Sequence, residues 1–192
     1  MRVRFLTLTT LMAVTLSACA TDTSNPHEYL DEKTAATVSM AARPIVLARE
    51  RPELAAHARE YLTLAAAAVN HTGAIDHYLF VYLWSTVDRR LAPGNVNLAN
   101  DLIIRADDRQ IRPPLVGHTP REAGITTAVG APPGHLWSLH IYRSDLATLR
   151  FLSEARQITV TTASPAGQVM YELWDDERDS LKSLVRHLDG LD

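Results

Sequence analysis

Alternating apolar positions predict that the chain from residue 34 onward consists mainly of β-strands. The clearest case is Ile75–Thr86, in which both faces of the predicted strand are apolar. One face carries Tyr78, Phe80, Tyr82 and Trp84, and the other carries Ile75, Leu79, Val81 and Leu83. A strand that is apolar on both faces is covered on both faces, so we expect it in the interior of the fold. The aromatic stripe is either the floor of a ligand groove or, as is more common, part of the core.

Shorter segments with a similar pattern predict the remaining strands. They are Thr34–Met40, Ile45–Ala48, Leu102–Arg105, Gln110–Arg112, His135–Tyr142, Ile158–Thr162 and Val169–Trp174. Tyr61–Val69 is ambiguous, because its alanines also favour a helix. The Asn70-His71-Thr72-Gly73 sequence that follows is typical of a hairpin turn, and we therefore interpret Tyr61–Val69 as a strand.

Two segments have the apolar spacing of a helix. Ser144 and Asp145 can cap the first, whose apolar stripe is Leu146, Leu149, Leu152 and Ala155. The second lies near the end of the sequence and stops at Gly190, with apolar residues at i, i+3, i+4 and i+7, namely Leu181, Leu184, Val185 and Leu188. The sequence thus predicts a mainly β (α+β) fold, an antiparallel β-sandwich of about eight strands with one or two short helices.

The first nineteen residues have a different character. Arg2 and Arg4 precede Phe5–Ala18, a mostly apolar stretch of fourteen uncharged residues. That length fits the apolar region of a signal peptide, about 7–15 residues, and is shorter than the roughly 20 needed to span a bilayer as a helix. The only cysteine of the chain, Cys19, follows Leu16-Ser17-Ala18, and this sequence resembles the lipobox of bacterial lipoproteins.

The resemblance to lipoproteins implies cleavage between Ala18 and Cys19 and attachment of lipid to Cys19, with acyl chains of the palmitate type. The bilayer is then a partner of the protein, through the acylated cysteine. Ala20 stands where enteric lipoproteins retained in the inner membrane have aspartate, so we expect the outer membrane, on the side facing the periplasm. The expected organisation is a signal peptide in residues 1–18, a lipidated cysteine with a flexible tether in 19–33, and a single globular domain in 34–192.

Charge and motifs exclude several functions. Two of the 19 basic residues and none of the 22 acidic ones lie in the leader, which leaves a mature net charge of −5 and disfavours nucleic acid as a partner. No Gly-x-Ser-x-Gly or His-Glu-x-x-His sequence occurs, so we assign no catalytic residue, no cofactor and no metal site. The acidic residues Asp175, Asp176, Glu177 and Asp179 lack the calcium-loop pattern and suit the positive end of the helix that follows.

One irregular segment is the first place to expect a contact with a partner. Residues 113–134 hold five of the ten prolines and four of the eight glycines, and loops of this length are usually functional or disordered. Within it, His118, Arg121 and Glu122 are candidates to meet another envelope protein. The leading hypothesis is a membrane-anchored, non-enzymatic binding or assembly module of the bacterial envelope. The alternative is a periplasmic enzyme or small-ligand carrier with a pocket under the 113–134 loop.

Overall fold

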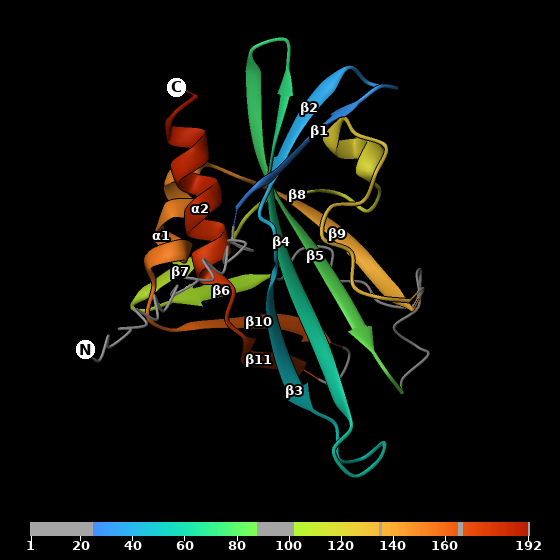
Figure 1. The fold of residues 1–192 in the computed structure, drawn as a ribbon. Coiled ribbons are helices and arrows are strands. Elements are labelled where there is room, and N and C mark those ends of the chain that lie inside the picture. The colour runs from blue at the N-terminus through green and yellow to red at the C-terminus, as the bar shows by residue number, and fades with distance from the viewer. Residues whose placement is uncertain (1–24, 88–101, 135, 165–166, 192) are drawn as a thin grey trace, which may run out of the picture.

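The computed structural model describes residues 25–87, 102–134, 136–164 and 167–191 (Figure 1). The described residues form, in chain order, β1 (His27–Asp31), β2 (Ala36–Met40), β3 (Ile45–Glu50), β4 (Arg59–His71), β5 (Ala74–Ser85), β6 (Ile103–Ala106), β7 (Arg109–Ile111), β8 (Leu115–Gly117), the 3₁₀ helix η2 (Pro120–Ala123), β9 (Trp137–Ser144), α1 (Leu146–Glu154), β10 (Ile158–Ser164), β11 (Gly167–Asp175) and α2 (Arg178–Asp189). The predicted leader and lipid-attachment residue, including Ala18 and Cys19, lie outside the described residues.

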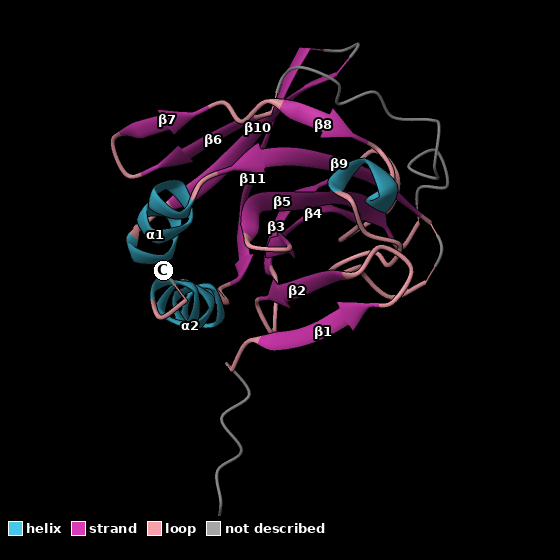
Figure 2. Cartoon of the chain, turned by 90° about the horizontal axis from the view of Figure 1, so that it is seen from above, coloured by secondary structure: helices cyan, strands magenta, loops and turns pink. Residues whose placement is uncertain are grey.

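The eleven described strands form one antiparallel sheet that curls into a half-barrel (Figure 2). Its order is β7-β6-β10-β11-β3-β4-β5-β9-β8, and β1 and β2 join it at β4. The long strand β4 shares one edge between two partners, because β3 pairs with its first half and β2 with its second half. The mainly β, antiparallel character is therefore confirmed, but a sandwich is not, because the strands pair into a single sheet.

The chain itself links the two ends of the curled sheet. The path through the sheet ends at β7 and β8, which are consecutive in sequence and separated by residues 112–114. A connection of that length spans at most about 14 Å, at about 3.5 Å for each step. Pro113 and Pro114 have no N–H group and cannot continue a strand ladder. The carbonyl of Pro114 instead accepts a hydrogen bond from the backbone N–H of Arg143 at 2.9 Å.

Both faces of the central strands β4 and β5 are buried, as the sequence predicted. On one face, the helix face, α1 and α2 pack against residues that include Leu62, Leu64, Leu79 and Val81. On the opposite face, Tyr78, Phe80 and Tyr82 belong to a second apolar cluster together with residues of the 113–134 segment. Most of the aromatic stripe is thus core, and its last residue, Trp84, is only partly buried.

The break between β2 and β3 at Arg43-Pro44 is the position where α2 joins the sheet. The backbone N–H of Arg43 donates to Ser180 Oγ at 2.9 Å, and its guanidinium pairs with Glu177 at 2.5 Å. The Ser180 hydroxyl of α2 therefore accepts a hydrogen bond from the Arg43 N–H, a backbone group that the interruption of the strand would otherwise leave unpaired. Both predicted helices are confirmed, and α1 begins at the predicted cap, where the Asp145 carboxylate accepts from Thr148 N–H at 2.6 Å.

Two differences from the prediction concern short edge strands. β1 lies within residues 19–33, which were expected to be tether, so the folded part begins earlier, at His27. Its only buried residue is Asp31, so β1 has no apolar alternation by which it could be recognised. β8 and η2 lie within the segment expected to be irregular. None of the helices in the described part of the chain is long and apolar enough to cross a bilayer.

Candidate functional site

The predicted contact residues lie on the 113–134 segment, which we call the strap. The Glu122 carboxylate accepts hydrogen bonds from the backbone N–H groups of His118 and Thr119, both at 2.8 Å, and these N–H groups hold its pKa below the ordinary value. A side chain at Gly117 would collide with this carboxylate, since a Cβ atom there would lie 2.1 Å from Glu122 Cδ. Glu122 thus organises the strap itself, while the side chain of Arg121 is exposed.

The strap is fixed to the sheet along its length. Its residues Ala123, Ile125 and Val129 are buried in the second apolar cluster, and the Tyr82 hydroxyl donates to the Val129 carbonyl at 2.6 Å. The Asp31 carboxylate accepts from both the backbone N–H of Thr126, at 2.5 Å, and its hydroxyl, at 2.8 Å. Apolar side chains therefore occupy the space between the strap and the sheet in this region.

The Asp31→Asn substitution is expected to loosen the strap, because a neutral amide oxygen accepts the two Thr126 bonds more weakly than a carboxylate, and the amide NH₂ group would face the Lys33 N–H that Asp31 Oδ1 now accepts. We expect faster amide hydrogen exchange at Thr126 and nearby strap residues, with the exchange of β4 unchanged. The N–H of Thr126 is the main cause of the lowered pKa of Asp31, so the wild-type contact should persist as the solution is acidified below the usual aspartate range. Asp108→Asn, in an exposed turn, is the matched control. Equal strap exchange in both variants would contradict the assignment.

A buried histidine lies beside the strap. His140 on β9 is 2% exposed, and neither ring nitrogen has a hydrogen-bond partner in the described part of the protein. The His118 ring lies against it at right angles, with centroids 4.7 Å apart. Burial, and secondarily the charge of His118, lower the pKa of His140 to about 4. His140 is therefore a neutral imidazole at physiological pH.

The acidic residues at the start of α2 are paired within the protein. Glu177 binds Arg43, and Asp176 binds the guanidinium of Arg178, with Nε 2.6 Å from the carboxylate. Among the residues that the structure describes, no group of three or more His, Cys, Asp and Glu side chains could hold a metal ion. The interpretation of this run as helix-terminal carboxylates agrees with its position at the N-terminus of α2.

The three tryptophans of the chain and Tyr61 lie along one line across the sheet, which we call the aromatic row. Cross-strand pairing places Trp137 of β9 opposite Trp84 of β5, and Trp84 opposite Tyr61 of β4. Tyr61 is opposite Ala48 of β3, and Ala48 is opposite Glu172 of β11. Trp174 follows two positions after Glu172. Because Ala48 is small, it leaves space above β3 for Trp174 and Tyr61 to approach each other.

The rings of the aromatic row contact one another. Tyr61 and Trp84 stack with centroids 4.3 Å apart, and Trp174 meets Tyr61 edge to face at 6.3 Å. The Trp84 indole N–H donates to Thr63 Oγ1 at 3.0 Å, which fixes its orientation. Trp174, at the end of the row, remains 54% exposed. The row is therefore an ordered surface in which Trp174 is exposed and the other three rings are partly buried.

An open groove with a volume of about 440 Å³ lies at the Trp174 end of the row. Its lining is formed by Ala48, Arg49, Glu50, Arg59, Met170, Glu172, Leu173 and Trp174. The Arg59 guanidinium lies 4.3 Å above the Trp174 ring and also pairs with Glu50 at 3.4 Å. Met170 is 55% exposed, so the groove combines an apolar floor with charged margins.

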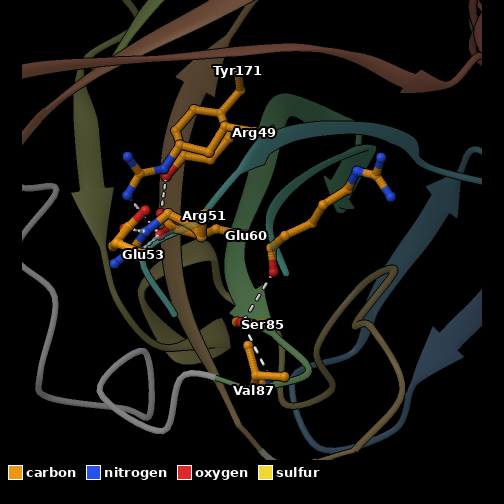
Figure 3. Close-up of polar contacts among 8 residues, drawn as sticks. Arg49, Arg51, Glu53, Glu60, Ser85, Val87 and Tyr171 are labelled. Carbon is orange, nitrogen blue, oxygen red and sulfur yellow. Dashed lines mark hydrogen bonds and ion pairs between the residues drawn. The ribbon is translucent and has the colours of Figure 1, made fainter. Parts of the chain in front are cut away.

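A buried carboxylate holds together the strands that carry the groove (Figure 3). Glu60 follows Arg59 on β4 but points to the helix face, where it is 3% exposed. It accepts hydrogen bonds from Arg49 on β3 at 2.7 Å, from Arg51 after β3, and from the Tyr171 hydroxyl on β11. Burial and the charge of Glu60 raise the pKa of Tyr171, so the phenol stays a donor. This arrangement, the Glu60 cluster, fixes β3, β4 and β11 relative to one another.

No protein-family model, curated protein or solved structure matches this chain. The chemistry of the groove is therefore inferred from the residues that line it. It differs from the site that the sequence suggested, because His118, Arg121 and Glu122 belong to the strap and do not line it. Sequence reasoning identified Trp84 within an apolar stripe but missed its alignment with Trp137 and Trp174, which depends on the pairing of distant strands.

Proposed function

We propose that this chain is a lipid-anchored lipoprotein of the bacterial cell envelope, whose folded domain is a non-enzymatic binding module. The observation that carries the anchoring is the Leu16-Ser17-Ala18-Cys19 sequence at the end of an apolar leader. Only seven residues, 20–26, separate Cys19 from β1. Seven residues span at most about 25 Å even when fully extended, so a lipid on Cys19 would keep the domain close to its bilayer, which by the lipobox analogy is the outer membrane facing the periplasm.

The groove supports a binding role for the domain. Its lining offers one exposed indole, a thioether, carboxylates and guanidinium groups, and contains no serine, threonine, cysteine or histidine. The usual pairing of a nucleophile with a histidine base is therefore not available within this set of residues. An exposed ring with charged margins is suited instead to recognising another component of the envelope, which is the partner that we propose.

The anchoring is tested by the Cys19→Ser substitution in a bacterial host. The wild-type protein is expected in the membrane fraction, with an intact mass that includes a diacylglycerol group on the cysteine. The Cys19→Ser protein, which cannot form the thioether, should be lost from that fraction almost entirely. Ala20→Ser is the control and should behave as wild type. A serine variant that remains fully with the membranes, or wild-type protein without acyl mass, would refute the anchoring.

A further inference from the structure

We infer that the groove beside Trp174 binds the sugar residues of an envelope polysaccharide, an inference that rests on the proposed binding function. The groove opens where two paired strands diverge. β3 and β11 pair over Val46–Ala48 and Glu172–Asp175, and Arg49, Glu50 and Met170, which lie beyond this pairing, line the groove.

The groove lining matches the two kinds of surface on a sugar ring. One side of a pyranose is a sheet of C–H groups, which packs against an aromatic face or a thioether, and its rim consists of hydroxyl groups. Trp174 and Met170 supply the apolar contact, and both are more than half exposed. Glu50 and Glu172 can accept hydrogen bonds from hydroxyls, while Arg59 can donate to ring and hydroxyl oxygens.

Trp174 is held ready for such a contact before any ligand arrives. The Arg59 guanidinium lies over its ring and the edge contact with Tyr61 supports it from β4. Tyr61 is in turn stacked on Trp84, whose N–H is bonded to Thr63. The ring therefore loses little freedom on binding, and a preorganised aromatic side chain lowers the entropic cost of recognition.

The direction of the aromatic row suits a linear chain of sugars. Adjacent strands lie about 4.7–4.9 Å apart, so the row from β9 through β5, β4 and β3 to β11 extends over about 19 Å. The strand spacing is close to the length of one sugar residue in an extended β-1,4-linked glycan. A chain that enters the groove at Trp174 can thus continue across the sheet over Tyr61 and Trp84.

Charge favours a neutral glycan over an anionic bilayer surface as the occupant. Charged groups of both signs surround Trp174: Glu50, Glu172 and Asp175 are exposed carboxylates, and the two arginines of the groove each pair with a glutamate. A neutral hydroxyl group can donate to a carboxylate and accept from a guanidinium, so it can bond to groups of either sign. A uniformly anionic surface meets repulsion from the carboxylates.

The test uses the full chain purified in mild detergent and two glycan probes. Insoluble bacterial cell-wall glycan measures cosedimentation, and the β-1,4-linked tetramer of N-acetylglucosamine measures the dissociation constant by tryptophan fluorescence. Wild type should bind both, and Trp174→Ala should weaken binding by at least tenfold. Trp174→Tyr retains an aromatic face and should lose less than Trp174→Ala. Glu172→Gln should weaken binding a few-fold, and Leu30→Ala, which removes an exposed leucine on β1, should leave it unchanged.

Three outcomes would overturn the inference: no binding of either glycan by the wild type, equal binding by Trp174→Ala, or Trp174-dependent binding of the Cys19→Ser chain to phosphatidylethanolamine–phosphatidylglycerol vesicles instead of glycan. Thermal unfolding of each variant separates lost binding from lost folding. An acylated protein that binds no glycan refutes this inference and leaves the anchoring intact. A protein that binds glycan but carries no acyl group refutes the anchoring alone.

Discussion

Replacing Glu60 by alanine is expected to lower the free energy of unfolding by about 3–5 kcal/mol, the usual cost of removing one partner from a buried ion pair. The substitution leaves Arg49 and Arg51 without their shared carboxylate and leaves the Tyr171 hydroxyl without its acceptor. The Glu60 side chain is only 4% exposed, so water cannot easily replace the lost bonds. Urea unfolding followed by circular dichroism measures the change as a shift of the midpoint.

Arg51 also provides a matched control for the Glu60 substitution, because it pairs with a second glutamate. Glu53 also binds Arg51, but its side chain is 58% exposed. Exposed ion pairs of that kind contribute little to stability, so Glu53→Gln should be almost neutral. Glu60→Gln, which keeps the shape and one acceptor oxygen, should lie between the two. If Glu60→Ala and Glu53→Gln shifted the midpoint equally, the cluster would have no special role in stability.

The same substitution connects stability with the groove. The three residues that bind Glu60 come from β3, from the connection after it and from β11, and these strands carry Ala48 and Trp174. Loss of the carboxylate should therefore increase the mobility of β11 relative to β4 and change the environment of Trp174. Tryptophan fluorescence of the folded Glu60→Ala protein reports this change under conditions where circular dichroism still shows native structure.

Local patterns predicted the elements of this fold well. The two-sided apolar pattern of β5, the turn at Asn70–Gly73 and the cap at Asp145 all depend on residues close in sequence. The turn has the expected chemistry, since the Asn70 side chain accepts from Gly73 N–H and Thr72 has a left-handed backbone with φ 52°. Tyr61–Val69 proved to be a strand because it pairs with β5 along that hairpin.

Long-range pairing was beyond the reach of such patterns. Alternation predicts that strands exist but not which strands are neighbours, so one curled sheet and a sandwich of two sheets have similar sequences. β1 and β8 lie at or near edges and bury few side chains, so their patterns are weak. The aromatic row depends on the register of strands from Ala48 to Trp174, and the bond between Glu60 and Tyr171 joins residues 111 positions apart. Neither arrangement could be read from neighbouring residues.

The composition of the strap led the sequence interpretation in a different direction. Its prolines and glycines indicated a loop, and loops of that length often carry function. The structure shows another use for this composition. Pro113 and Pro114 connect the two ends of the sheet, and Gly117 allows the Glu122 carboxylate to approach the backbone. The apolar residues Ile125 and Val129, which lie farther along the strap between Gly124 and Gly130, complete the core over Phe80 and Tyr82.

Acidification from pH 7 to pH 4 is expected to lower the free energy of unfolding by about 3 kcal/mol through His140 alone. Burial lowers the pKa of this imidazole to about 4 in the folded protein, whereas an unfolded histidine titrates near 6.5. Between these values the unfolded state binds the proton and the folded state does not, so stability falls as the pH falls. The difference of about 2.5 pH units, at about 1.36 kcal/mol each, gives the expected size.

The His140→Leu substitution should remove this pH dependence and leave the protein at least as stable at pH 7. Among the residues that the structure describes, neither ring nitrogen of His140 has a hydrogen-bond partner, so an apolar side chain of similar size forfeits none of the bonds seen there and avoids burying a polar group. His118→Gln removes the secondary, charge-based cause of the lowered pKa, and should reduce the slope only slightly. His27→Gln, at an exposed position on β1, is the control that should leave the slope unchanged.

Urea unfolding at pH 7, 6, 5 and 4 distinguishes His140 from the carboxylates. The aspartates with lowered pKa values, Asp31, Asp107 and Asp145, stabilise the fold above the ordinary aspartate pKa and lose that contribution only as the pH falls further. A decline that begins near pH 6.5 therefore belongs to histidine. If His140→Leu and wild type declined in parallel over this range, the imidazole would already be protonated in the folded protein, and its burial without a partner would not be the cause of the acid sensitivity.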